Sequence, residues 1–188
     1  MRVMDDIRNY VPGCEQEARD QAQMLAFMAA HPDCLERSCL AGHMTASAWV
    51  VNPERTKVLM AYHDLYDAWA WLGGHADGDD NLRAVALREA QEESGIRHAH
   101  LASEEIFSIE TLTVDGHVKH GVWVPSHLHF NVTFLVEADE DERLTARPGE
   151  NQAVQWFAFE DAMRASTEKW MVEQVYRKLA ARAAALRK

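Results

Sequence analysis

Residues 73–96 read GGHADGDDNLRAVALREAQEESGI, a glycine turn and an acidic loop followed by a helical pattern that stops at a second glycine. We expect the helix to begin near Asp79 or Asp80, whose carboxylates can accept hydrogen bonds from its free N–H groups, and to end before Gly95. A helix advances by about 100° per residue, so its first turns present one apolar stripe. The stripe consists of Leu82, Val85 and Ala86. This segment therefore predicts a core-packed helix directly after a tight turn.

The same helical face becomes acidic in its last turns, at Glu89, Glu92 and Glu93. Like charges three or four residues apart cost about 0.2–0.5 kcal/mol per pair, and the negative end of the helix dipole disfavours acids further. Arg88 relieves only part of this repulsion. A hard divalent cation with oxygen ligands would remove the conflict. The alternative is a solvated acidic helix end, but the acids continue the core-facing stripe, and we therefore predict a metal site.

The composition indicates a globular protein with one main domain and additions. The chain has 188 residues, of which 47% are hydrophobic and 26% are charged, which is enough to build a core. No apolar run approaches the roughly 20 residues of a membrane span, and the N-terminus lacks the apolar run of a signal peptide. We therefore expect no membrane partner.

The net charge and the cysteine content limit which partners and which cellular compartment we expect. A net charge of −11 argues against a nucleic-acid backbone as partner. A small phosphorylated ligand stays compatible, because bound cations reverse the local field. Cys14, Cys34 and Cys39 are odd in number and follow no zinc-site spacing. We therefore expect a reduced, cytoplasmic setting.

Hydrophobic periodicity predicts helices at both ends of the chain and strands between them. Residues 15–30, 160–164 and 166–188 read as helices. The predicted strands are 45–52, 57–63, 68–72, 105–115, 127–137 and 153–159. We expect the first two strands to form a hairpin, and strand 105–115 to run antiparallel to strand 127–137.

Several side chains near the glycine turn are candidates for substrate binding. Trp69 and Trp71 share one face of strand 68–72 and could stack on a base or ring, although most strand tryptophans are core residues. His127 and His129 share one face of strand 127–137 and could meet a ligand or the metal, although strand histidines usually have structural partners. We expect residues 116–126 to form a loop that carries specificity.

Residues 74–96 resemble the Nudix box, G-x5-E-x7-R-E-U-x-E-E-x-G-U, in which U is apolar. Gly74 fills the first glycine, and residues 88–96, REAQEESGI, fit the second half without a gap. Asp80 departs from the pattern, because it stands in the place of the first glutamate and is one methylene shorter. The motif is long and positionally strict. The order of elements around it also resembles the family, over roughly residues 43–185.

The resemblance implies an α/β fold, namely an α/β/α sandwich around a mixed sheet. Residues 43–188 would form the Nudix domain with its C-terminal helix, and residues 1–42 would form an extra N-terminal helical arm. The resemblance also implies a bound Mg²⁺ or Mn²⁺ ion. Its ligands would be Glu89, Glu92 and Glu93, with the backbone carbonyl of the Gly74 turn close by.

The resemblance further implies hydrolysis of a nucleoside diphosphate linked to another moiety, by attack of water on phosphorus. Arg88 would orient the acids, and an acid from a later loop would act as a further ligand or as the general base. Glu150 is the candidate for that acid, although it also reads as an exposed turn residue. Proteins of this kind are often homodimers, so a homodimer is an open expectation.

Two other functions fit the same fold. A nucleotide-sensing module would bind without cleaving, but such modules usually lack some of the box acids, and Glu89, Glu92 and Glu93 are present. An isopentenyl-diphosphate isomerase would carry a catalytic cysteine after the strand that leads to the glycine turn. The stretch AWAWLGGHADG has no cysteine there.

Overall fold

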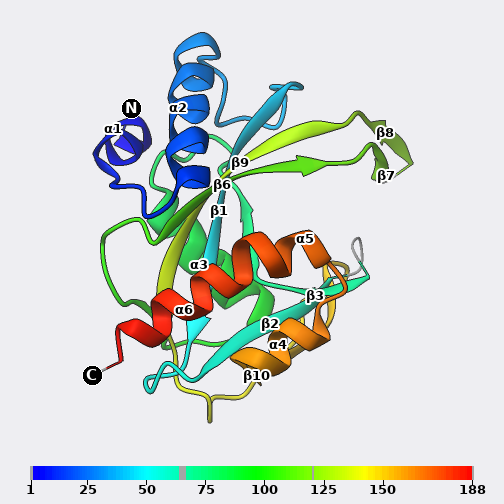
Figure 1. The fold of residues 1–188 in the computed structure, drawn as a ribbon. Coiled ribbons are helices and arrows are strands. Elements are labelled where there is room, and N and C mark those ends of the chain that lie inside the picture. Colours follow the sequence, from blue (N-terminus) through cyan, green and yellow to red (C-terminus); the bar gives the residue numbers. More distant parts are fainter. Residues whose placement is uncertain (1, 64–66, 120, 188) are drawn as a thin grey trace.

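A computed structural model describes residues 2–63, 67–119 and 121–187 (Figure 1). Helices α1 (Arg2–Asn9) and α2 (Glu15–Ala30) come first. The strands are β1 (Gly42–Val51), β2 (Lys57–His63), β3 (Ala68–Ala70), β4 (Leu72–His75), β5 (His100–Leu101), β6 (Ser108–Val114), β7 (His117–Lys119), β8 (Val122–Val124), β9 (His127–Glu137) and β10 (Asn151–Ala158). Helix α3 (Leu82–Ser94) lies between β4 and β5. After β10 come α4 (Phe159–Ala165), α5 (Lys169–Met171), a π-helical turn (Val172–Tyr176) and α6 (Arg177–Ala185).

Strand β1 forms the centre of a mixed sheet. The main strand order is β10-β2-β1-β9-β5, and β3, β4 and β6 pair with β2, β1 and β9 respectively. β1 runs parallel to β9 from Gly42, opposite Leu128, to Val51, opposite Glu137. β4 pairs antiparallel with β1. Every residue of β1 is buried, as expected for a strand that is covered on both faces.

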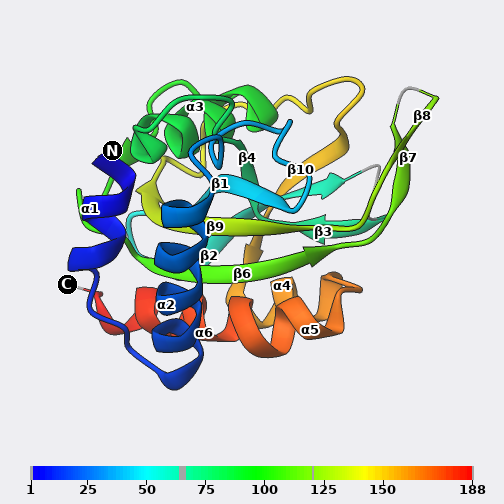
Figure 2. The ribbon, with the colours of Figure 1, turned by 90° about the horizontal axis from the view of Figure 1, so that it is seen from above.

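The helices cover both faces of this sheet, as Figure 2 shows, with α3 on one side and α4 to α6 on the other. Alternate residues of β1 supply the two cores. Ala48 and Val50 belong to the core that contains α3, α1 and α2, while Trp49 and Val51 belong to the core under the C-terminal helices. The predicted α/β/α sandwich around a mixed sheet, with an N-terminal helical arm and a C-terminal helix, is confirmed.

The structure adds α1 and β5 to the predicted elements and differs from them in three further places. Residues 116–126 are not a loop but carry the β7–β8 hairpin, which projects from the sheet (Figure 1). Gly121, with φ +79°, supplies the left-handed backbone that a tight hairpin needs. Strand 68–72 is divided into β3 and β4, and helix 166–188 is divided by the π-helical turn. Residues 120 and 188 of these segments lie outside the described residues.

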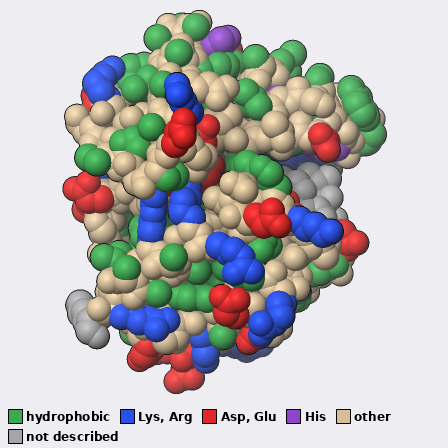
Figure 3. All heavy atoms as spheres, viewed as in Figure 1, with side chains coloured by type: hydrophobic (Ala, Val, Ile, Leu, Met, Phe, Trp, Pro, Cys, Tyr) green, Lys and Arg blue, Asp and Glu red, His purple; other side chains and the backbone are tan. Residues whose placement is uncertain are grey.

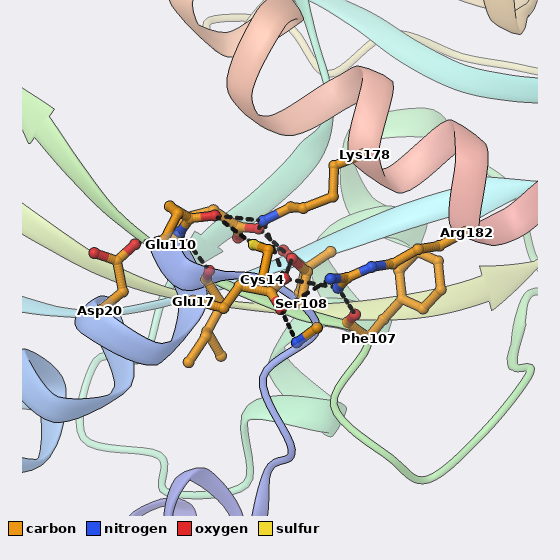
Figure 4. Close-up of polar contacts among 12 residues, drawn as sticks. Cys14, Glu17, Asp20, Phe107, Ser108, Glu110, Lys178 and Arg182 are labelled. Atoms are coloured by element: carbon orange, nitrogen blue, oxygen red, sulfur yellow. Dashed lines mark hydrogen bonds and ion pairs between the residues drawn. The ribbon is translucent and has the colours of Figure 1, made fainter.

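The N-terminal arm is joined to the C-terminal helix by buried ion pairs, which Figure 4 shows. The carboxylate of Glu17 on α2 accepts hydrogen bonds from both terminal nitrogens of Arg182, at 2.6 and 2.8 Å. The ammonium group of Lys178 lies 3.1 Å from Glu17 and 3.1 Å from Glu110. We call Glu17, Glu110, Lys178 and Arg182 the arm cluster. Burial alone would raise the pKa of Glu17, but the hydrogen bonds from Arg182 and Gly13 outweigh it and lower the pKa to about 2.

The surface carries charge of both signs. Figure 3 shows Lys and Arg side chains over the part of this face that α5 and α6 cover, and hydrophobic side chains on the projecting hairpin. The exposed side chains of the hairpin are Val118, Val122 and Trp123. Within residues 2–63, 67–119 and 121–187, none of the helices has the length and apolar character needed to cross a membrane.

Candidate active site

The glycine turn is required by two close backbone approaches. A Cβ on Gly73 would lie 2.6 Å from the carbonyl oxygen of Ala46, so the turn can lie against β1 only without a side chain. A Cβ on Gly74 would lie 2.7 Å from the carboxyl carbon of Glu89. The second glycine therefore lets the backbone lie directly against the first acid of the helix.

Helix α3 starts later than predicted and ends where predicted. Its N-cap is Asn81, which makes no side-chain capping bond. The capping role expected of Asp79 or Asp80 is wrong: Asp79 accepts from the backbone N–H of Asn81, and Asp80 accepts from the backbone N–H of Arg2. Both carboxylates hold the preceding loop instead. At the other end, Gly95 has φ +75° and its N–H donates to Gln91, which is the expected left-handed helix end.

The acids of α3 differ in exposure, because the helix turns them toward and away from the sheet. Glu93 is 3% exposed and Glu89 is half-buried, while the side chain of Glu92 is exposed. Burial, with the charge of Glu89, raises the pKa of Glu93 to about 8 even though the backbone N–H of Gly73 donates to it at 3.2 Å. Burial and the charge of Glu92 also raise the pKa of Glu89. The electrostatic conflict predicted from the helix spacing is thus present in the folded chain.

Arg147 brings the acids of the helix and of the later loop together. Its Nη1 atom lies 2.8 Å from Glu92, 3.1 Å from Glu150 and 3.7 Å from Glu89, in each case measured to Oε2. Glu150 therefore joins the helix acids, and we call Glu89, Glu92, Glu93 and Glu150 the acid cluster. The sequence reasoning missed Arg147. In the sequence, the only feature that pointed to Arg147 was its place three residues before Glu150 in the same loop.

The loop that carries Arg147 and Glu150 is anchored to the end of α3 by hydrogen bonds. The N–H of Thr145 donates to the carbonyl of Ser94 at 2.7 Å. The side-chain amide of Asn151 donates to the carbonyl of Glu93 at 3.0 Å and accepts from the N–H of Arg147 at 3.0 Å. These bonds place the loop acid beside the helix acids, although they are far apart in sequence.

Arg88, predicted to orient the acids, lies beside them but is not at their centre. Its guanidinium is 3.6 Å from Glu89 and 3.8 Å from Asp79. Because Arg88 is 44% exposed, these pairs are screened by solvent and individually weak. The central position belongs to Arg147.

The acid cluster borders a cavity of about 1150 Å³. Glu89, Glu93 and Glu150 line it together with both glycines of the turn. Its polar lining includes Ser47 and Asn131, whose side chains are hydrogen-bonded at 2.8 Å. Its aromatic lining consists of Trp71, Trp170 and Tyr176. The cavity thus combines acids at one wall with flat apolar side chains and hydrogen-bonding groups at others.

The residues predicted to bind substrate fall into two groups. Trp71 and His129 line the cavity. Trp69 instead packs between the rings of Tyr62 and Phe157, at centroid distances of 5.5 and 4.9 Å. His127 stands behind His129, with 3.2 Å between their Nε2 atoms. Trp69 and His127 are absent from the described residues that line the cavity, so only one member of each predicted pair lines it.

The acid cluster fits a hard divalent cation. Carboxylate oxygens are the ligands that Mg²⁺ and Mn²⁺ prefer, and oxygens of Glu89, Glu92 and Glu150 already converge on one positively charged nitrogen of Arg147. The guanidinium groups of Arg147 and Arg88 do not balance four carboxylates. Glu89, Glu92 and Glu93, with Glu150 at the edge, would therefore hold such a cation beside the Gly74 turn.

Comparison with known proteins places the chain in a family. The family model for the NUDIX domain matches residues 42–179. Similar solved structures include a C. elegans Ap4A hydrolase (20% identity, TM-score 0.56, covering 76% of this chain and 98% of that one) and a NUDIX-family hydrolase from Clostridium perfringens (22%, 0.52, 74% and 97%). A third is the Nudix hydrolase RenU from M. smegmatis (14%, 0.56, 77% and 88%). No curated protein matches the chain. Because the family model spans most of the chain, including the glycine turn and the acid cluster, the chain belongs to the Nudix family of hydrolases that act on phosphoanhydride bonds.

Proposed function

We propose that this protein is a Mg²⁺- or Mn²⁺-dependent pyrophosphohydrolase. It would cleave the diphosphate bond of a nucleoside diphosphate linked to another moiety, by attack of water on phosphorus. The observation that carries the proposal is the convergence of Glu89, Glu92 and Glu150 on one cation position at the wall of a large cavity.

Some residues of the chain would bind the cation, and another would accept the proton of the attacking water. A bound divalent cation would offset the charge of the phosphates and lower the pKa of water. Glu89 and Glu93, which lie against the Gly73–Gly74 turn, would serve with Glu92 as ligands of this cation. Glu150 lies on the loop at the cavity wall, and in this proposal it accepts the proton of the attacking water. Glu92 and Glu93 are the other acids that could accept this proton, and variants of each distinguish them.

The cavity supports a nucleotide as the bound molecule. Trp71 and Trp170 offer flat faces on which a base could stack, and Ser47 and Asn131 offer hydrogen-bonding groups. Lys169, also in the lining, and Arg37 offer positive charge for a phosphate. The cavity volume of about 1150 Å³ exceeds that of most small-ligand sites, which agrees with a substrate made of two linked parts.

A substrate panel tests the proposal. Nucleoside triphosphates, sugar nucleotides, dinucleotides such as Ap4A, and CoA compounds would each be incubated with Mg²⁺ or Mn²⁺, and phosphate-containing products would be measured. We expect turnover of at least one compound and none with chelator. The Glu160→Gln variant is the matched control, because Glu160 is an exposed acid on α4 and its loss should leave turnover unchanged.

Two outcomes of the panel would contradict the proposal. Tight binding of a nucleotide without turnover of any compound would favour a sensing module. Isomerisation of isopentenyl diphosphate would favour the isomerase, but no cysteine occurs among the described residues that line the cavity. The cytoplasmic location and a homodimer remain predictions, which cell fractionation and sedimentation would test.

A further inference from the structure

Three histidines from three paired strands meet beside the glycine turn, and His127 lies next to them, with its Nε2 atom 3.2 Å from that of His129. His43 stands on β1 directly opposite His129 on β9, and His75 on β4 stands opposite Thr45 of β1. The strand register therefore brings the three rings together. One ring nitrogen of each lies within 4.8 Å of one ring nitrogen of each of the others.

The spacing of the rings matches a tetrahedral metal site. Ring centroids are 5.1 Å apart for His43 and His75, 5.0 Å for His43 and His129, and 4.9 Å for His75 and His129. In a tetrahedral site with Zn–N distances of about 2.0–2.1 Å, imidazole centres are about 5 Å apart. The rings are tilted by 41° to 86° rather than stacked. Nitrogens bound to one tetrahedral Zn²⁺ lie about 3.3 Å apart, so binding requires the rings to rotate toward one another.

His43 presents a nitrogen that lacks a partner in the described structure. The residue is 5% exposed, and its Nε2 atom is buried with no hydrogen-bond partner among the described residues. Its Nδ1 atom lies 3.4 Å from the carbonyl oxygen of Cys39. If the proton sits on Nδ1 and is shared with this carbonyl, Nε2 carries a free lone pair, which is how metal-binding histidines are usually oriented. A buried acceptor without a partner costs about 1–3 kcal/mol, and a bound metal would remove this cost.

The surroundings keep these imidazoles neutral, as metal binding requires. Burial lowers the pKa of His43, and burial with the neighbouring histidines lowers the pKa of His129 to about 2. The charges of Arg37 and Lys119 act on His75, and the guanidinium of Arg37 is paired with both carboxylate oxygens of Asp77 at 2.6 and 2.5 Å. This pairing limits the repulsion that Arg37 would exert on a second cation.

We propose that His43, His75 and His129 form a second metal site, selective for Zn²⁺ and separate from the carboxylate site. Imidazole nitrogens favour Zn²⁺, whereas the acid cluster favours Mg²⁺ or Mn²⁺. Three protein ligands leave a fourth position of tetrahedral zinc for water or for a ligand. His75 and His129 line the cavity, so this fourth position opens toward the bound molecule.

Zinc titration of the full chain tests the proposal. The protein would be stripped with chelator and titrated with Zn²⁺ by calorimetry in saturating Mg²⁺, which occupies the acid cluster. Co²⁺ would serve as a second probe, because four-coordinate Co²⁺ has a distinct visible absorption. We expect one tightly bound Zn²⁺ per chain. The variants His43→Ala and His129→Ala should each weaken Zn²⁺ binding by at least about 100-fold.

Matched controls separate this site from the carboxylate site. His98→Asn changes an exposed histidine outside the group, and Glu92→Gln changes the acid cluster, so both should keep full Zn²⁺ affinity. If His43→Ala fails to fold by circular dichroism, the partly exposed His75 supplies the deciding variant, His75→Asn. The proposal is overturned if the histidine variants bind Zn²⁺ as tightly as the original chain. It is also overturned if Glu92→Gln abolishes zinc binding, or if the original chain binds none in Mg²⁺.

Discussion

Two buried acids in this molecule respond to burial in opposite directions. In the arm cluster, the pKa of Glu17 is lowered to about 2, while in the acid cluster the pKa of Glu93 is raised to about 8. Both side chains are almost fully buried, so burial alone does not explain the difference. Glu17 faces two cations and further N–H and O–H donors. Glu93 faces the carboxylates of Glu89 and Glu150, which are opposed by the N–H of Gly73 and the charge of Arg147.

The difference separates a structural site from a functional one. The arm cluster has its positive charges supplied by the chain, from Lys178 and Arg182 on the C-terminal helix (Figure 4). The acid cluster has two partly exposed arginines, Arg147 and Arg88, for four carboxylates. A perturbed acid that lies in a cavity and has too few cations is a candidate for function, because a ligand can supply the missing charge. The acids of the arm cluster already have their cations within the chain, so they need no bound ligand.

The largest expected effect is on activity, in the variant Glu93→Gln. Glutamine keeps the shape and the hydrogen bond from Gly73 but removes the charge that holds a metal. Metal assistance is worth several kcal/mol, so we expect kcat/KM to fall by about 10³-fold. Above about pH 8, where Glu93 is ionised in the metal-free chain, unfolding of the variant should need as much urea as the original chain or more, because a buried like charge is lost. Full activity would show that the metal assignment is wrong.

The opposite pattern is expected for Glu17→Gln in the arm cluster. Removing one partner of a buried ion pair costs about 3–5 kcal/mol, so the free energy of unfolding measured in urea should fall by that amount. The catalytic rate of the folded variant should change little. The matched control is Glu15→Gln on the same helix, where the exposed pair with Arg19 at 3.6 Å should be worth less than about 1 kcal/mol. Equal effects of the two variants would contradict the structural role of Glu17.

Acid titration sharpens the comparison. Because the folded-state pKa of Glu17 lies below its ordinary value, the unfolded chain binds this proton more readily, and the stabilisation is present above about pH 4.5 and lost as the pH falls toward about 2. The shift corresponds to about 3 kcal/mol. Thermal unfolding measured across this window should show a steeper loss for the original chain than for Glu17→Gln. Parallel curves would contradict the lowered pKa.

A smaller effect is expected for Gly74→Ala. The new Cβ would meet the Glu89 carboxyl carbon at 2.7 Å and displace that acid, and displacements of about 1 Å near a reacting centre are costly. We expect activity to fall by about tenfold or more with the fold retained by circular dichroism. Glu160→Gln, which changes an exposed acid on α4, is the control. An unaffected rate in Gly74→Ala would show that Glu89 tolerates movement.

Much of the fold and part of the site could be predicted because they depend on local spacing. The stripe of Leu82, Val85 and Ala86 is buried as expected, and Gly95 ends the helix. The prediction that Asp79 or Asp80 caps the helix was wrong, because these loop acids accept hydrogen bonds from the backbone N–H groups of Asn81 and of Arg2 in the arm instead. The hairpin at 117–124 was also missed, since its short strands carry no buried face that would produce an alternating pattern. The division into residues 1–42 and 43–188 stays a prediction.

The sequence by itself determined the glycine turn, the helix and its three acids, because these features lie within 24 residues and repeat with the helical period. Only the tertiary structure decided which charges oppose those acids. It brought Arg147 and Glu150 to the end of α3, Lys178 and Arg182 to Glu17, and three histidines of three strands to one point. Such meetings depend on strand register and helix packing between distant segments, and no local pattern encodes them.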